Sequence, residues 1–271
     1  MKNRPTLREC TALHWKYSHR TPLLIVLLTV TRGMLGFAQT SAPVTILQQS
    51  LAAHVGTGGL LPSDLVIQGQ ITDTSGTRPF RMQVKGKYKI RYELGLTPQM
   101  GVAIYNAGVA WTGLSTKLTR LPEHAAKRRP LELPFLDVIV DYSDPNFKAR
   151  YVGLEVLSAR TVHHVTMRLS DPTPQQRFLN RPLHEDVDLF IDQSTNLIVR
   201  SQRMQAADNS LDFRVPWVLD FSDYRQVGSL VIPFRILNTL GTRYSGIRQS
   251  VLVIHSVLVN QGIADSVFLP Q

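Results

Sequence analysis

Residues 87–94 read Lys87-Tyr-Lys-Ile-Arg-Tyr-Glu-Leu94 and alternate strictly between charged and apolar side chains. Successive side chains of a β-strand point to opposite faces of a sheet, so this stretch predicts a strand with one charged and one apolar face. Such a strand is typical of an antiparallel sheet that is dry on one side and solvated on the other. The dipeptide Lys85-Gly86 is a turn signal, and it predicts a hairpin with the strand before it.

The same alternation continues on both sides of this stretch. Apolar residues recur at every second position over 65–71 and over 80–84, and a turn signal follows at 106–108. Further strands are predicted at residues 151–158, 162–169, 185–191, 196–204, 217–226, 229–238 and 246–259. The chain therefore carries roughly ten to twelve strands, which is typical of a mainly β protein.

Two short segments have helical rather than alternating spacing. In residues 43–55 an apolar face is formed by Val44, Leu47, Leu51 and Val55, which predicts a helix packed by one side. In residues 131–142 a proline stands at a suitable first helical position, and it is followed by Phe135, Leu136, Ile139 and Val140. These elements predict an α+β fold in which one curved antiparallel sheet carries helices on its concave, apolar face.

The start of the chain has the three parts of a secretory signal peptide. A basic stretch through Arg20 leads into the apolar run Pro22–Val30, and Gly36-Phe-Ala38 supplies small residues before Gln39. The apolar run would span only about 14 Å as a helix, far less than the roughly 30 Å of a bilayer core. We expect residues 1–38 to be removed, with no stable transmembrane anchor, and residues 39–271 to form a single domain. An uncleaved anchor is the alternative.

Charge and cysteine content narrow the class of protein further. The formal charge is +10, but residues 1–38 hold six basic residues and one acid, which leaves 24 Lys+Arg and 19 Asp+Glu, a net +5, in the remainder. This balance does not indicate a nucleic-acid partner. The run Lys127-Arg-Arg129 is interpreted as a solvated loop, with a functional anion or lipid-headgroup patch as the alternative, and residues 171–182 are predicted to form a loop. Cys10 is the one cysteine, so residues 39–271 have no disulfide.

Candidate ligand-binding residues lie on the early strands. Flexible methionine and amphipathic aromatic side chains can line an adaptable apolar cavity, and an ordinary packed core is the alternative. The candidates are Phe80, Met82, Tyr88, Ile90, Tyr92, Ile104 and Trp111.

Signals for catalysis or metal binding are weak. No nucleophile elbow, phosphate-binding loop or dinucleotide fingerprint occurs in the sequence. His163 and His164 are adjacent on a predicted strand and point to opposite faces, so they do not share a metal easily. Asp186 and Asp188 share a face and form a candidate cation site or acid/base pair, although the solvated face of an edge strand explains them as well. We expect no catalytic residue, no metal and no cofactor.

The C-terminal third contains the predicted strand Gly228-Ser-Leu-Val-Ile-Pro-Phe-Arg-Ile236, the long predicted strand from Val251 to Asn260, and the closing Asp265-x-x-Phe268-x-Pro270. These features resemble the LolA-like family of outer-membrane lipoprotein-sorting proteins. The early segments Leu65–Gln70 and Lys85–Tyr92 also resemble the early strands of this family. The resemblance spans about residues 43–271 and implies an incomplete antiparallel β-barrel, with helices plugging an apolar cavity that accepts acyl chains.

The function implied by this resemblance is a non-enzymatic carrier or binding protein. Its partners would be acyl chains of lipids or lipoproteins, in the periplasm or cell envelope of a bacterium, in outer-membrane biogenesis. Two alternatives stay open at this point. One is an envelope-stress regulator of the RseB type, which shares the fold and binds an envelope membrane protein. The other is a secreted hydrolase that uses Asp186 and Asp188.

Overall fold

The computed structural model describes most of the unit Thr40–Gln271. The described residues are 42–56, 60–86, 89–96, 98–122, 133, 147–169, 186–206, 214–242 and 246–270. The predicted signal peptide, the predicted helix at 131–142 apart from Leu133, the run at 127–129 and the loop at 171–182 lie outside them.

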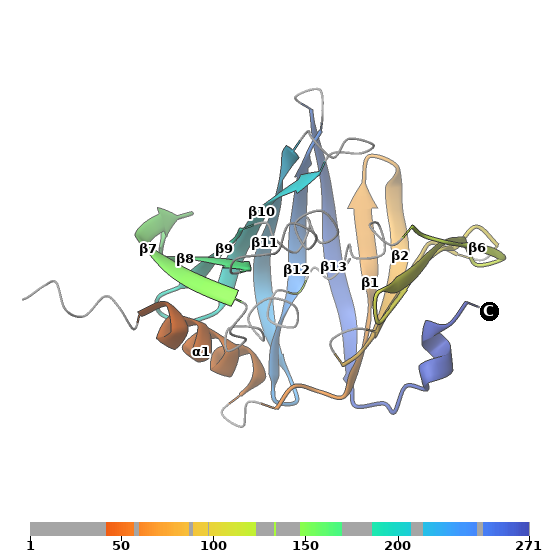
Figure 1. Cartoon of the computed structure of the whole chain (residues 1–271), viewed down its shortest axis with the longest axis horizontal. Coiled ribbons are helices and arrows are strands. Elements are labelled where there is room, and N and C mark those ends of the chain that lie inside the picture. Colours follow the sequence, from red (N-terminus) through yellow and green to blue (C-terminus); the bar gives the residue numbers. More distant parts are fainter. Residues whose placement is uncertain are drawn as a thin grey trace, which may run out of the picture. The chain divides into compact units, whose positions relative to one another are not determined.

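Thirteen strands form one antiparallel sheet (Figure 1). The elements are α1 (Ala42–Val55), β1 (Asp64–Asp73), β2 (Gly76–Lys85), β3 (Lys89–Leu94), β4 (Gly101–Asn106), β5 (Val109–Leu114), β6 (Lys117–Arg120), β7 (Phe147–Leu157), β8 (Arg160–Leu169), β9 (Val187–Asp192), β10 (Ile198–Ala206), β11 (Arg214–Val227), β12 (Leu230–Gly241), β13 (Ile247–Val259) and the 3₁₀ helix η3 (Asp265–Phe268).

The strand order explains why the sheet is open. It runs β6-β5-β4-β3-β2-β1-β13-β12-β11-β10-β9-β8-β7, so every neighbour but one is adjacent in sequence. The exception is the pair β1–β13, which joins the first strand to the last. Strands β6 and β7 are the two edges and do not pair with each other, so the barrel is incomplete, as predicted.

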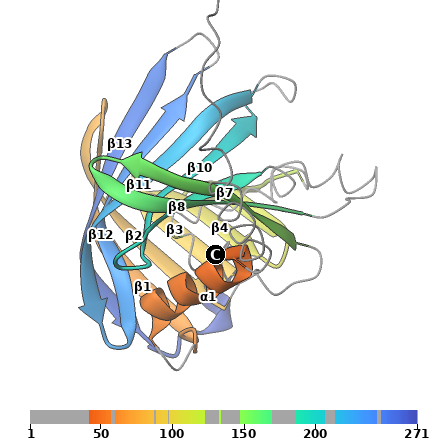
Figure 2. The ribbon, with the colours of Figure 1, turned by 90° about the vertical axis from the view of Figure 1, so that its left-hand side faces the viewer.

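The sheet bends around helix α1. The helix contacts both β12 and β7, which stand five places apart in the strand order, and a flat sheet could not bring both to one helix (Figure 2). We call the face that meets α1 the inner face and the opposite one the outer face. The predicted one-sided packing of the helix is confirmed, with one correction. Val44 is 43% exposed, and the buried side is formed by Ile46, Leu47, Ser50, His54 and Val55.

A glycine in β1 permits the closest approach between strands. The pairing of β1 with β13 shifts register between Gln68 and Gly69. A Cβ atom at Gly69 would lie 2.1 Å from the carbonyl oxygen of Val253 and 2.8 Å from Cε1 of Phe80. Because both distances are far inside van der Waals contact, this strand position requires glycine.

The chain after β13 forms a strap, residues 260–270, against the outer face. Phe268 is fully buried there with Val102 and Ile104 of β4. Asp265 bridges Lys85 and Lys89, with N–O distances of 2.8 and 2.7 Å. The hydrogen bonds from these two lysines hold the pKa of Asp265 down at about 2. The closing motif therefore serves to cover an apolar part of the outer face.

The strap begins at a buried carboxylate. Asp64 accepts hydrogen bonds from the backbone N–H groups of Gln261, Gly262 and Ile263 at 2.6, 3.0 and 3.3 Å. Burial alone would raise the pKa of Asp64, but these donors outweigh it and hold the pKa below its ordinary value. The first residue of β1 is thus tied to the chain just beyond β13.

Candidate functional site

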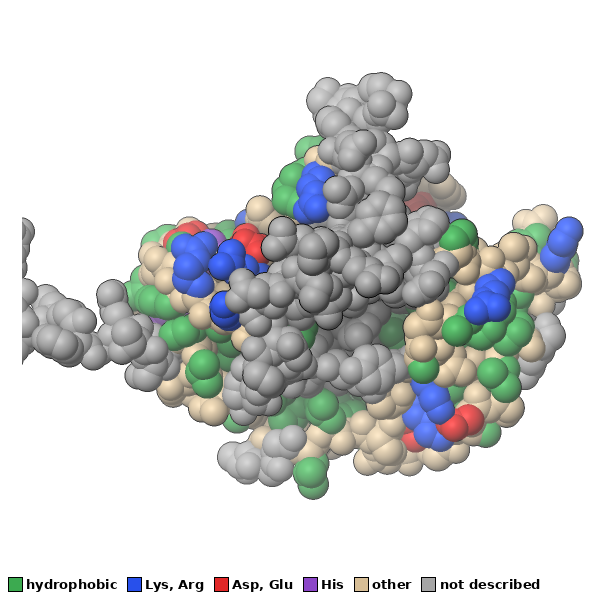
Figure 3. Space-filling model, in the orientation of Figure 1, with side chains coloured by type: hydrophobic (Ala, Val, Ile, Leu, Met, Phe, Trp, Pro, Cys, Tyr) green, Lys and Arg blue, Asp and Glu red, His purple; other side chains and the backbone are tan. Residues whose placement is uncertain are grey.

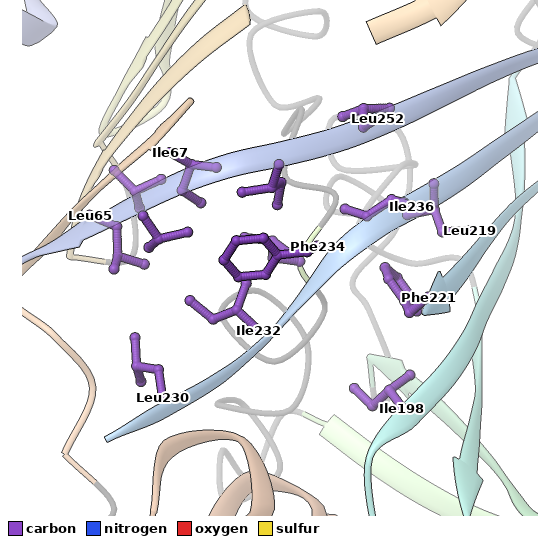
Figure 4. Packing of buried hydrophobic residues seen from close by; sticks show 14 of the residues in the cluster. Leu65, Ile67, Ile198, Leu219, Phe221, Leu230, Ile232, Phe234, Ile236 and Leu252 are labelled. Atoms are coloured by element: carbon purple, nitrogen blue, oxygen red, sulfur yellow. The ribbon is translucent and has the colours of Figure 1, made fainter. Parts of the chain in front are cut away.

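The inner face is apolar across most of the sheet. Buried side chains from α1, β1–β3 and β8–β13 form one continuous cluster (Figure 4). Those labelled in the figure are Leu65, Ile67, Ile198, Leu219, Phe221, Leu230, Ile232, Phe234, Ile236 and Leu252. Such a surface has no directional chemistry, and it suits a ligand recognised by burial of hydrocarbon.

The predicted hairpin supplies one end of this surface. Strands β2 and β3 pair with Met82 opposite Tyr92 and Val84 opposite Ile90. Directly opposed residues share a face, so the predicted residues Phe80, Met82, Ile90 and Tyr92 lie together on the inner face. The rings of Phe80 and Tyr92 stack with centroids 6.0 Å apart. Tyr88 lies outside the described residues.

Ile104 and Trp111 are not brought to this face. Ile104 is opposite Arg91 on one side and Trp111 on the other, which places all three on the outer face. There Ile104 is fully buried and Trp111 partly buried beside the C-terminal strap. Both residues therefore belong to a separate cluster, and the structure divides the predicted ligand-binding residues between the two faces of the sheet.

Five aromatic residues of the inner face are partly exposed within the described ranges. One of them, Tyr92, was predicted, and the others are Tyr105 of β4, Tyr151 of β7, and Trp217 and Tyr224 of β11. Tyr105 is opposite Ile90, which fixes its face. The alternation of β4 was the available signal, because Tyr105 and Ile104 are neighbours and only one of them can point inward.

His54 fixes α1 to the sheet. Its Nδ1 atom lies 3.0 Å from the carbonyl oxygen of Val231 in β12, and its Nε2 atom lies 3.3 Å from the backbone nitrogen of Ile198 in β10. Only a protonated nitrogen donates to a carbonyl and only a bare one accepts from N–H, so the ring is the neutral Nδ1–H tautomer. Burial lowers the pKa of His54 to about 4, against a smaller opposing effect of the Val231 hydrogen bond.

The histidines and carboxylates of β8 and β9 are engaged in local contacts. His163 lies on the inner face, where its Nδ1 atom is 3.2 Å from the hydroxyl of Tyr151, and burial lowers its pKa. His164 lies on the outer face, 2.6 Å from Oε1 of Glu155 and 3.1 Å from Oδ1 of Asp188. The predicted opposite orientation of the two histidines is confirmed. Within the ranges that the structure describes, no group of three or more His, Cys, Asp or Glu side chains is arranged to hold a metal ion.

The acidic pair has a different setting from the predicted one. Asp188 accepts a hydrogen bond from Thr166 at 2.7 Å, while Asp186 is exposed and precedes β9. Strand β9 pairs on both sides, with β8 and β10, so Asp188 lies on the outer face of an internal strand, and only the predicted edge position is wrong. Asp192, at the end of β9, is used by a turn. It accepts from the backbone N–H groups of Ser194 and Thr195.

Surface chemistry and hydropathy add little to the inner-face site. Figure 3 shows apolar and basic side chains interspersed over the surface that it colours. Among the described residues, no helix combines the length and the hydropathy that crossing a membrane requires.

Comparison with solved structures identifies the fold. A DUF1329 family protein from Desulfovibrio piger is 14% identical with a TM-score of 0.55, over 84% of this chain and 97% of that one. A LolA superfamily protein from Nitrosomonas europaea is 9% identical with a TM-score of 0.54, over the same shares of the two chains. A domain assigned to outer membrane lipoprotein sorting from Vibrio parahaemolyticus is 13% identical with a TM-score of 0.55, over 83% and 95%.

Sequence comparisons found no matching family model and no matching curated protein. At these identities the structural likeness concerns the fold alone. The likeness covers nearly the whole length of each neighbour, and it therefore includes most of the open thirteen-stranded sheet. The chain has a LolA-like fold.

Proposed function

We propose that the protein is a non-enzymatic binding protein that carries acyl chains of lipids or lipoproteins on its inner face. The observation that carries the proposal is the pairing of a continuous apolar surface with partly exposed aromatic residues, among them Tyr92, Tyr105 and Trp217. Partly exposed aromatic side chains at the margin of an apolar cluster can contact a ligand as well as the core. The LolA-like fold supports the same class of ligand.

The physical chemistry of the inner face suits an acyl chain. Burying one methylene stabilises a complex by about 0.8 kcal/mol, so ten methylenes supply about 8 kcal/mol before the costs of association. That sum sets an upper limit on the affinity, a dissociation constant of about 1 μM, because the costs of association are subtracted from it. Methionine side chains such as Met82 and Met167 of the cluster adapt their shape to a flexible ligand.

The proposed setting is the envelope of a bacterium. It rests on the signal-peptide pattern of residues 1–38 and on the fold shared with a domain assigned to lipoprotein sorting. The carried lipid would be received from and delivered to envelope membranes, in which a membrane protein is a natural second partner.

A matched pair of variants tests the proposal. Ile71 of β1 is partly exposed on the inner face, opposite Leu252. Val253 of the neighbouring strand is 36% exposed, and it is opposite Gln70 on the outer face. Both are β-branched strand residues in adjacent rows. We expect Ile71→Glu to weaken binding of a fluorescent fatty acid about tenfold or more, which is 1.4 kcal/mol, and Val253→Glu to leave it unchanged.

Two measurements accompany the titration. Denaturant midpoints of both variants establish that each is folded. Native mass spectrometry of wild-type protein purified from an envelope fraction shows whether lipid accompanies it. The proposal is wrong if wild-type protein binds no fatty acid, or if both substitutions weaken binding equally.

A further inference from the structure

One row of residues crosses the inner face and ends in an arginine on each side. Arg203 of β10 is opposite Trp217 of β11, Trp217 is opposite Leu240 of β12, and Leu240 is opposite Arg248 of β13. Directly opposed residues in antiparallel strands share a face, and Trp217 packs against the inner-face cluster. All four residues of this row, the Arg–Trp–Leu–Arg row, therefore lie on the inner face.

The row lies near the ends of strands β10–β13, at the margin of the inner-face cluster. Two positions further along each strand are Leu219 and Asn238, and two positions beyond those are the buried Phe221 and Ile236. The side chains thus change from buried hydrocarbon, through a mixed row, to a row with two guanidinium groups. A ligand lying along the strands would meet hydrocarbon first and positive charge at its end.

Contacts within the row orient its central residues. The guanidinium carbon of Arg203 lies 3.9 Å from the centroid of the Trp217 ring. The indole Nε1 of Trp217 donates to Oδ1 of Asn238 at 2.7 Å, which fixes the ring. Arg203 is thus turned along the row, toward Arg248, and the Cα atoms of the two arginines are three strand spacings, about 14 Å, apart. Two long side chains at this separation can bracket one headgroup.

The charged side chains of three of these four strands are all basic. Strands β10, β12 and β13 contain Arg200, Arg203, Arg235 and Arg248 and no aspartate or glutamate. The neighbouring carboxylate of β11, Asp220, pairs with Arg200 at 2.6 Å on the outer face. The two charged side chains of the Arg–Trp–Leu–Arg row are therefore both basic, and such side chains attract anions.

We propose that the Arg–Trp–Leu–Arg row binds the anionic headgroup, a carboxylate or a phosphate, of an amphiphile whose acyl chain lies on the inner face. This inference rests on the proposed function and names the class of ligand. Guanidinium groups bind carboxylate and phosphate oxygens through paired N–H donors. Tryptophan suits such a boundary because its ring is apolar and its N–H is polar.

The test compares ligands that share a hexadecyl chain and differ in the headgroup. Palmitate carries a carboxylate, hexadecyl phosphate a phosphate and hexadecanol no charge. The variant is Arg203→Gln/Arg248→Gln, and the control is Arg235→Gln, which removes an exposed arginine from the outer face of β12. We expect the double variant to lose about tenfold affinity or more for the anions, with hexadecanol unaffected and the control unchanged.

The outcomes separate the two proposals. Preference for palmitate or for hexadecyl phosphate shows which anion the row accepts, and added salt weakens that binding but not binding of hexadecanol. Equal wild-type affinity for all three ligands overturns this inference and leaves the proposed function standing, as does an equal loss for all three in the double variant. Failure of wild-type protein to bind any of the three overturns the proposed function itself.

Discussion

The neutral, buried ring of His54 leads to a quantitative prediction about acid stability. In the folded protein the pKa of His54 is about 4, while a histidine in an unfolded chain titrates near its ordinary pKa of 6.5. As pH falls, the unfolded state takes up the proton first, because protonation of the folded state would break the bond from Ile198 N–H and bury a charge. Stability from this residue is therefore complete above the unfolded pKa and declines between the two values.

The size of the effect follows from the pKa difference. One pKa unit corresponds to about 1.4 kcal/mol, so His54 accounts for a loss of about 3 kcal/mol in the free energy of unfolding between about pH 7 and pH 4. The variant His54→Gln lacks this titration. It starts less stable at pH 7, since hydrogen bonds to β10 and β12 are perturbed, and the two stability curves converge as the pH falls.

Urea titrations of both proteins across this pH range measure the difference directly. Subtracting the variant from the wild type cancels the titration of every other group, provided that the unfolded states are alike. His255→Gln is the control, because it removes an exposed histidine from β13. A difference between wild type and His54→Gln that stays constant from about pH 7 to pH 4 would refute the reasoning.

Three further predictions follow from the fold and the sequence. Gly69→Ala should destabilise the protein by about 3 kcal/mol or more through overpacking between strands. Gly101→Ala should not, because the added Cβ atom would lie 3.7 Å from its nearest neighbour, and the urea midpoints of the two variants test the difference. Phe268→Ala should lower the free energy of unfolding by about 3–5 kcal/mol, because it leaves a cavity at a buried site. Leu269 is 48% exposed, so Leu269→Ala should have little effect, and equal thermal midpoints of the two variants would contradict this prediction. N-terminal sequencing of the envelope form should begin at Gln39, and a start at Met1 would indicate an anchor.

The strands were predictable because most have one dry and one wet face. Alternation over residues 87–94 and the turn at Lys85-Gly86 identified a hairpin that the structure contains. The short strand β6, of four residues, carries too little alternation to be recognised, which is why roughly ten to twelve strands were expected instead of thirteen. The pairing of β1 with β13 depends on contacts between chain segments almost 200 residues apart, and local patterns hold no information about it.

Helix α1 shows how tertiary contacts override a local pattern. Apolar spacing alone placed Val44 on the buried side. The structure instead buries Ser50 and His54, because the imidazole reaches the backbone of β10 and β12 and both of its nitrogens find partners. A polar side chain is tolerated in a core once its hydrogen bonds are satisfied, and a hydropathy pattern does not show which polar residues will be.

The candidate site divides for a related reason. The prediction of one set of ligand-binding residues assumed that the sheet has a single dry face. In β4 this assumption fails, since Val102 and Ile104 lie on the outer face and are still buried. The cover is the C-terminal strap, more than 150 residues later in the chain, whose Phe268 fills the outer cluster. A strand covered on both sides reads as a run of apolar residues with no preferred parity. Only the register with β3 decides that Tyr105 belongs to the proposed ligand surface and that Ile104 does not.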